Sequence, residues 1–143
     1  NGRNTMLSNK QVQQIKEINA KYQVVQFTGW KDASSLATYY RHAKALIFPS
    51  LSEGFGIPIL EAYFYHLPLL LSNQASLSEV AGEAAIYFNP YDTNEIAQTI
   101  LQFVQQSDHS DLIALQTQRL ARYSWKYASN QLNVQIQQIC KSI

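Results

Sequence analysis

The stretch that decides the fold spans residues 45–61 and reads Ala-Leu-Ile-Phe-Pro-Ser-Leu-Ser-Glu-Gly-Phe-Gly-Ile-Pro-Ile-Leu-Glu. Its first four residues form a continuous apolar run that ends at Pro49, which is typical of a buried parallel strand. Residues 50–56 form a loop of small residues, and Pro58 has the fixed φ angle preferred at the first position of a helix. The sequence therefore predicts a strand, a glycine loop and a helix over residues 59–65, in that order.

The same alternation extends in both directions along the chain. We predict strands at Val24–Thr28, 66–72 and 85–88, and helices over 9–22, from Ser34 or Ser35 to residue 43, from Ser76, and from Asp92. Capping boxes are expected at two of these helices, formed by Ser8 with Gln11 and by Ser76 with Glu79, and Asp92 with Glu95 is expected to open a third helix. Strands that alternate with helices imply right-handed βαβ units, so we expect an α/β fold with a Rossmann-like parallel sheet and flanking helices.

Length, composition and charge limit the class of protein. The 143 residues, 46% of them hydrophobic, fit one domain over 1–143, in which residues 108–143 form a helical tail. The net charge of +1, without a run of basic residues, argues against nucleic-acid binding. Cys140 is the single cysteine, which excludes a disulfide framework and a cysteine-based zinc cluster. The apolar runs fall far short of the roughly 20 residues of a membrane-spanning helix.

Two carboxylates carry the candidate chemistry. Glu53 and Glu61 stand eight residues apart, separated by Gly54, Gly56 and Pro58. In open parallel sheets, ligands bind outside the carboxyl ends of the strands, where a helix N-terminus offers unpaired amides to a phosphate. Glycines there let the backbone approach an anion closely, whereas carboxylates would repel it and are better suited to accept hydrogen bonds from hydroxyls, such as a ribose diol. Together these features indicate a nucleotide sugar as ligand.

These residues resemble the retaining glycosyltransferases of family 4, which have the GT-B fold of two Rossmann-like domains. The E-x7-E signature is present as Glu53 to Glu61. The resemblance continues through Phe27-Thr28-Gly29, Tyr40-Arg41-His42-Ala43, Leu67-Pro68, Ser78-Glu79-Val80 with Gly82, Asn89-Pro90, Glu95-Ile96-Ala97 and Tyr123-Ser124-Trp125. It therefore covers most of the chain.

The resemblance assigns a role to each matching residue. Glu53, the catalytic candidate, would contact hydroxyls of the donor sugar, and Glu61 would bind the ribose. The amides of Gly54, Phe55, Gly56 and Ile57 would hold the diphosphate. Backbone around Trp30 and Lys31 is similar to the family's base-binding segment. The implied reaction moves a hexose from a nucleotide diphosphate sugar to an acceptor hydroxyl with retention, without a metal or a cofactor beyond the donor itself.

Two departures from the family pattern stand out. His66 occupies a position where the family usually has glycine, so a left-handed helix cap there would carry a penalty. The family's upstream Arg and Lys and its N-terminal acceptor domain have no counterpart. We therefore expect an N-terminally incomplete, C-terminal nucleotide-sugar-binding domain that is inactive alone. Its parent would be a cytoplasmic enzyme of cell-envelope polysaccharide or glycolipid synthesis, peripheral to the inner face of the membrane, with a saccharide or lipid-linked acceptor.

Two other functions stay open from the sequence. One is a non-catalytic module that binds nucleotide sugar, and the other is a GT-B-type epimerase that acts on the nucleotide sugar itself. Glu53 argues against the first, because a pure nucleotide binder does not need a second carboxylate at the sugar end. Asp108 and Asp111 have the wrong spacing for a metal site, and His42 and His66 are expected to be structural or exposed.

Overall fold

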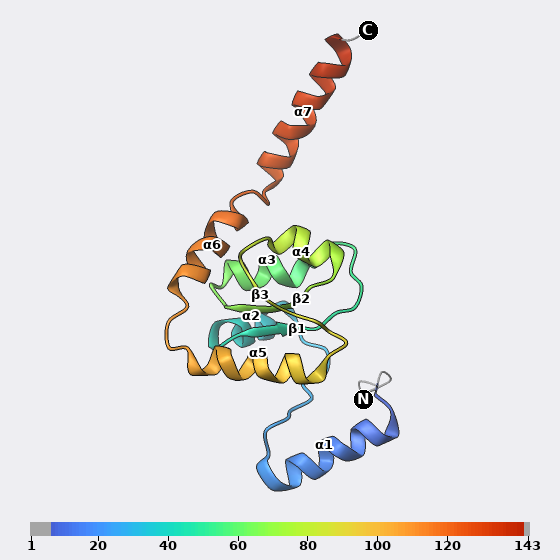
Figure 1. Ribbon diagram of the computed structural model, residues 1–143. Coiled ribbons are helices and arrows are strands. Elements are labelled where there is room, and N and C mark those ends of the chain that lie inside the picture. Colours follow the sequence, from blue (N-terminus) through green and yellow to red (C-terminus); the bar gives the residue numbers. More distant parts are fainter. Residues whose placement is uncertain (1–6, 142–143) are drawn as a thin grey trace. The chain divides into compact units, whose positions relative to one another are not determined.

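The computed structural model describes residues 7–141, apart from the side chain of residue 75, and this part of the chain divides into two compact units between Thr38 and Tyr39. Each unit is described by itself. The elements are, in chain order, α1 (Asn9–Tyr22), α2 (Ala33–His42), β1 (Leu46–Phe48), α3 (Ile57–Phe64), β2 (Leu69–Ser72), α4 (Ala75–Ala81), β3 (Ile86–Phe88), α5 (Thr93–Gln105), α6 (Ser110–Leu120) and α7 (Trp125–Lys141) (Figure 1). Within the described residues, none of these helices is long and apolar enough to cross a membrane.

The first unit confirms one prediction and corrects another. Helix α1 begins at the predicted capping box, in which the Ser8 hydroxyl accepts from the Gln11 amide at 3.3 Å. The predicted strand Val24–Thr28 is wrong, because these residues have no strand conformation. The Asn19 side chain instead accepts from the Val25 N–H at 2.8 Å and donates to the Val25 carbonyl at 2.6 Å. A side-chain amide thus satisfies backbone groups that a neighbouring strand would otherwise pair.

Helix α2 begins at Ala33, and the residue that caps it lies two positions before Ser34. The Asp32 carboxylate accepts from the Ser35 amide at 2.8 Å, so Asp32 caps the helix and the prediction of Ser34 or Ser35 is wrong. The hydrogen bond from the Ser35 amide lowers the pKa of Asp32. A carboxylate is the stronger acceptor here, because it also interacts favourably with the positive end of the helix dipole.

The second unit contains a three-stranded parallel sheet in the order β1-β2-β3, which confirms the predicted α/β class. In register, Ile47 lies opposite Leu70, and Leu71 lies opposite Tyr87. Strand β2 is central and buried along its whole length. It is shorter than the predicted 66–72, because the amides of residues 66 and 67 donate to the carbonyls of Tyr63 and Ala62 and so cap the end of α3.

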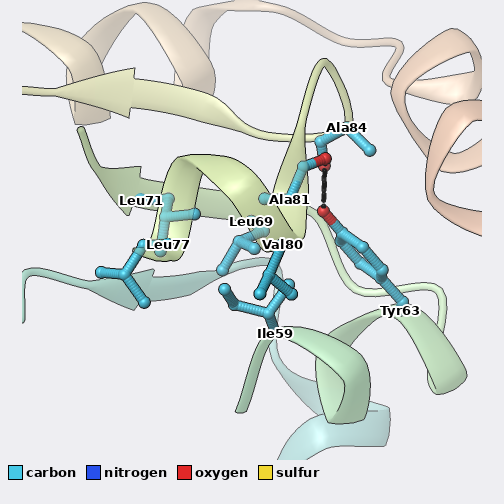
Figure 2. Packing of buried hydrophobic residues seen from close by; sticks show 8 residues of the cluster. All are labelled: Ile59, Tyr63, Leu69, Leu71, Leu77, Val80, Ala81 and Ala84. Carbon is cyan, nitrogen blue, oxygen red and sulfur yellow. Dashed lines mark hydrogen bonds between the residues drawn. The ribbon is translucent and has the colours of Figure 1, made fainter. Parts of the chain in front are cut away.

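Helices cover both faces of this sheet (Figure 1). On one face, side chains of β2, α3, α4 and the loop after α4 form a buried cluster, comprising Leu69, Leu71, Ile59, Tyr63, Leu77, Val80, Ala81 and Ala84 (Figure 2). On the other face, Leu70 packs with Phe88 and with Phe103 of α5. The alternation along β2 therefore sends successive leucines into two separate cores, as expected for a strand covered on both sides.

Helix α4 is held at its carboxyl end by α6 and the segment after it. The predicted Ser76–Glu79 capping box is wrong, because the N-cap is Gln74 and makes no side-chain cap bond. At the other end, Arg119 Nε donates to the Val80 carbonyl at 2.9 Å, and Arg119 Nη2 donates to the Glu79 carbonyl. The Tyr123 hydroxyl also donates to the Val80 carbonyl, at 3.0 Å. These donors satisfy carbonyls that a helix C-terminus leaves without intrahelical partners.

Helices α5, α6 and α7 follow the predicted order. Asp92 caps α5 by accepting from the amides of Asn94 and Glu95, as predicted. The Glu95 carboxylate accepts from the Asn89 amide at 2.9 Å. Beyond residue 108 the described chain is helical in α6 and α7, and α7 has no buried residue.

Candidate functional site

The glycine loop, residues 50–56, leaves the carboxyl end of β1 and leads directly into α3. Gly56 is the N-cap of α3, with φ 90° and ψ 56°, and makes no side-chain cap bond. A Cβ added at Gly56 would lie 2.8 Å from Leu77 Cδ2 and 3.0 Å from Ile59 Cδ1. Both the left-handed conformation and the lack of space therefore require glycine here. No side-chain oxygen caps α3, Pro58 has no amide N–H, and the Ile59 amide donates to the Gly56 carbonyl at 2.9 Å. The amide at the start of α3 that can bind a ligand is therefore that of Ile57, at the positive end of the helix dipole.

Gly54 differs from Gly56 both in its backbone conformation and in the space around it. A Cβ at Gly54 would meet nothing within 4 Å, and its φ lies outside the left-handed region. Neither packing nor backbone strain therefore requires glycine at position 54. Its lack of a side chain instead leaves the exposed backbone of the loop accessible to an anion.

Glu53 is exposed and held by two serine hydroxyls. Ser50 Oγ donates to Glu53 Oε1 at 2.8 Å, and Ser76 Oγ of α4 donates to the Glu53 carbonyl at 2.6 Å. The first bond orients the carboxylate, and the second fixes the backbone of the loop. Ser76 thus ties α4 to the glycine loop, which is a different role from the helix cap that its sequence position predicted.

Phe55 and Ile57 flank Gly56 and are both exposed, Ile57 at 64%. The Phe55 ring meets the Tyr123 ring edge-on, with centroids 5.7 Å apart and planes 80° apart. Tyr123 therefore contacts the glycine loop with its ring while its hydroxyl holds the end of α4. Ile57 is the first residue of α3 and carries one of the amides without an intrahelical partner.

Glu61 lies one turn into α3 and is partly buried. Tyr40 of α2 donates its phenolic hydroxyl to Glu61 Oε2 at 2.8 Å. Burial, followed by the hydrogen bond to Glu61, raises the pKa of Tyr40, so the phenol stays protonated and Glu61 is the acceptor.

The far end of α3 shows the expected departure at His66, which has a left-handed φ of 52°. The His66 amide donates to the Tyr63 carbonyl at 3.1 Å, and the Leu67 amide donates to the Ala62 carbonyl at 2.9 Å. Leu67 also packs with Ala62 in a small buried cluster. This is a Schellman motif, in which the left-handed position usually carries glycine. The helix that bears Glu61 therefore ends in a strained cap.

The structure brings most of the predicted site residues together. Glu53, Gly54, Phe55, Gly56, Ile57 and Glu61 lie along the glycine loop and the first two turns of α3, whereas Lys31 lies before α2 in the other compact unit. Three residues from other elements support the loop and Glu61 and were not predicted as site residues: Tyr40, Ser76 and Tyr123. Tyr40 precedes Glu61 by 21 residues, and no local pattern links the two. In the described part of the chain, no three His, Cys, Asp or Glu side chains are grouped to hold a metal ion.

Comparison with protein families gives a match that covers most of the chain. A profile described as Glycosyl transferases group 1 matches residues 2–106. O-antigen chain mannosyltransferase B of Escherichia coli is 31% identical over 119 residues, which are 82% of this chain and 31% of that protein. The serotype-specific mannosyltransferase WbdA of Escherichia coli is 36% identical over 100 residues, which are 69% of this chain and 12% of that protein. This chain therefore spans less than a third of either relative.

A solved structure shows the same fold. Sucrose-phosphate synthase from Thermosynechococcus elongatus superposes with a TM-score of 0.70 over 92% of this chain and 35% of that chain, at 24% identity. That protein is a GT-B glycosyltransferase, so the parallel sheet with its flanking helices belongs to the GT-B architecture. At this level of identity the likeness concerns the fold alone.

Proposed function

Because the chain belongs to the group 1 glycosyltransferase family, we propose that it forms the donor-binding part of a family 4 enzyme that transfers a hexose with retention from a nucleotide diphosphate sugar. The observation that carries this proposal is Gly56, whose left-handed backbone opens α3 where a side chain would collide with Leu77 and Ile59. An uncapped helix N-terminus at the carboxyl end of a parallel strand is suited to a diphosphate. The carboxylates on either side are suited to hydroxyls.

Each site residue has a role in this proposal. The amides of Gly54, Phe55, Gly56 and Ile57 hold the diphosphate, and the open space at Gly54 lets a phosphate oxygen approach the backbone. Glu61 accepts from the ribose hydroxyls through the oxygen that Tyr40 does not occupy. Glu53, oriented by Ser50, accepts from hydroxyls of the sugar. Lys31 and its neighbouring backbone contact the base.

The reaction that follows from these roles is a front-face substitution at the anomeric carbon. As the bond to the diphosphate breaks, negative charge develops on the leaving oxygen beside the amides of the loop and the α3 N-terminus. Fixed dipoles aimed at developing charge stabilise a transition state because they need no reorganisation. The acceptor hydroxyl then bonds to the same face of the sugar, and its proton leaves to the departing diphosphate.

The relatives favour a hexose donor and an envelope polysaccharide product. Those described above are named as an O-antigen chain mannosyltransferase and a serotype-specific mannosyltransferase. We propose that this chain acts in a longer cytoplasmic protein at the inner face of the membrane. Residues 1–143 form its nucleotide-sugar domain, and 108–143 are the helical tail of that domain. A separate N-terminal domain would supply the saccharide or lipid-linked acceptor and further basic residues, and no cofactor is needed beyond the donor.

The experiment is a calorimetric titration of the chain with UDP, GDP and ADP and with their glucose or mannose conjugates. One diphosphate should bind in the micromolar to millimolar range, and Glu61→Ala should weaken that binding at least tenfold. Glu83→Ala is the matched control, because it removes the same charge from an exposed position after α4 and should leave binding unchanged.

The outcomes separate the functions. Binding lost in Glu61→Ala but kept in Glu83→Ala supports the proposal and identifies the base. Equal binding by both variants, or no binding by the wild-type chain, overturns the proposed site. Product analysis with the full parent enzyme then tests the reaction, because transfer to an acceptor with retention differs from epimerisation of the free nucleotide sugar.

A further inference from the structure

We propose that Tyr40 is a positioning residue for the donor, which holds the Glu61 carboxylate in the one orientation that can accept from both ribose hydroxyls. This inference rests on the proposed function, in which Glu61 binds the ribose. The geometry that carries it is the 2.8 Å hydrogen bond from the Tyr40 hydroxyl to one carboxylate oxygen, Glu61 Oε2, so that the ribose hydroxyls are assigned to the other oxygen, Oε1. Tyr40 itself does not contact the substrate in this proposal.

The Tyr40 side chain is well fixed by its surroundings. It is only 8% exposed and packs with Ala62 and Leu67 in a buried cluster. Its ring stacks on Tyr65, with centroids 5.5 Å apart and planes within 13°, and the Arg41 guanidinium lies 5.5 Å from the centroid of the Tyr65 ring. A phenol held in this way presents its hydroxyl at a defined point beside α3.

Glu61 needs such a partner because its side chain is long and only partly buried. Each torsion between tetrahedral carbons has three staggered wells. If the hydrogen bond from Tyr40 is removed, one or two torsions of the Glu61 side chain become free. The fraction of molecules with Glu61 in the binding-competent rotamer then falls to about a third or a ninth. The apparent Kd rises by the inverse of that fraction, so Tyr40→Phe should weaken ribose-dependent binding by about three- to tenfold.

The same chain is titrated with the ribonucleoside diphosphate that the wild type binds, chosen from UDP, GDP and ADP, and with its 2′,3′-dideoxy counterpart. Tyr40→Phe should weaken the ribose form by about three- to tenfold and leave the dideoxy form within about twofold. Tyr65→Phe is the matched control, because it removes a phenolic hydroxyl from the stacked ring without touching the Tyr40–Glu61 bond. It should leave both affinities unchanged. In a Glu61→Ala background, Tyr40→Phe should have no further effect.

Each possible result of these titrations refutes a different statement. If Tyr40→Phe and wild type bind the ribose form equally, the positioning role is refuted while the proposed function stands. If Tyr40→Phe weakens both forms by the same factor, Tyr40 supports the fold alone, and the inference fails. If no diphosphate binds the wild-type chain, the proposed function fails and this inference falls with it.

Discussion

Replacing Gly56 with alanine tests whether the glycine that opens α3 at the candidate site is also required by the packing of the buried core. The new Cβ would lie 2.8 Å from Leu77 Cδ2 and 3.0 Å from Ile59 Cδ1. Both neighbouring side chains are fully buried, so neither can swing away without disturbing the cluster around them. The substitution also places a Cβ on a backbone with φ 90°.

The expected loss of stability follows from three contributions. A left-handed conformation costs a non-glycine residue about 1–2 kcal/mol, and overpacking a close-packed core costs about 1–3 kcal/mol. Alanine recovers roughly 0.5–1 kcal/mol, because it restricts the unfolded chain more than glycine does. Gly56→Ala should therefore lower the free energy of unfolding by about 2–4 kcal/mol, a large fraction of the roughly 5–15 kcal/mol of an ordinary domain.

Urea denaturation followed by circular dichroism measures this loss as a lower midpoint at an unchanged slope. Gly54→Ala is the matched control: its Cβ meets nothing within 4 Å, so stability should change by less than about 0.5 kcal/mol. Gly54→Ala should nevertheless weaken diphosphate binding, because its methyl group occupies the approach to the loop. Equal stability of Gly56→Ala and wild type would refute the argument that packing and backbone conformation require glycine at position 56.

Two further predictions concern the end of α3 and the buried tyrosines. His66→Gly should stabilise the chain by about 0.5–1 kcal/mol in the same assay, since it relieves the left-handed conformation at φ 52°; His66→Ala keeps that conformation and should not stabilise. If His66→Ala also stabilises the chain, the strain comes from the imidazole side chain and not from the left-handed backbone. Burial raises the pKa of Tyr40 and Tyr63, so the folded state keeps both phenols protonated where the unfolded chain ionises them. The free energy of unfolding that this difference in protonation contributes is complete below about pH 10. It declines as pH rises above that value, by up to about 1.4 kcal/mol per pH unit for each tyrosine. Unfolding free energies at pH 8 and pH 11 check this, and Tyr63→Phe should flatten the decline; parallel profiles for the variant and the wild type would contradict it.

The sheet and its helices could be predicted because their signals are local. The apolar run before Pro49, the glycines before Pro58, and the capping box at Ser8 each act within a few residues, and the structure has a strand or a helix at each place. The glycine loop was found for the same reason. Its small residues indicate a loop and Pro58 indicates a helix start, and the structure has a loop over 50–56 followed by α3.

The predictions were wrong, or were missing, where the conformation of a residue depends on a hydrogen-bond partner that local sequence patterns do not reveal. Val24–Thr28 has the composition of a strand, but β-branched residues form a strand only when another strand pairs with them, and Asn19 takes the backbone groups of Val25 instead. Ser76 fits a helix cap, yet its hydroxyl donates to the carbonyl of Glu53, 23 residues away. The bond from Tyr40 to Glu61 is equally invisible in the sequence, because it depends on how two helices lie in space.

The way in which Arg119 holds the end of α4 has a consequence for how this fold tolerates mutation. Its guanidinium donates to the main-chain carbonyls of Glu79 and Val80, which every amino acid carries. The junction therefore depends on the path of the backbone at residues 79 and 80 and not on their side chains. Exposed Glu79 can be exchanged during evolution without loss of this junction, whereas position 119 has to keep a forked cationic donor.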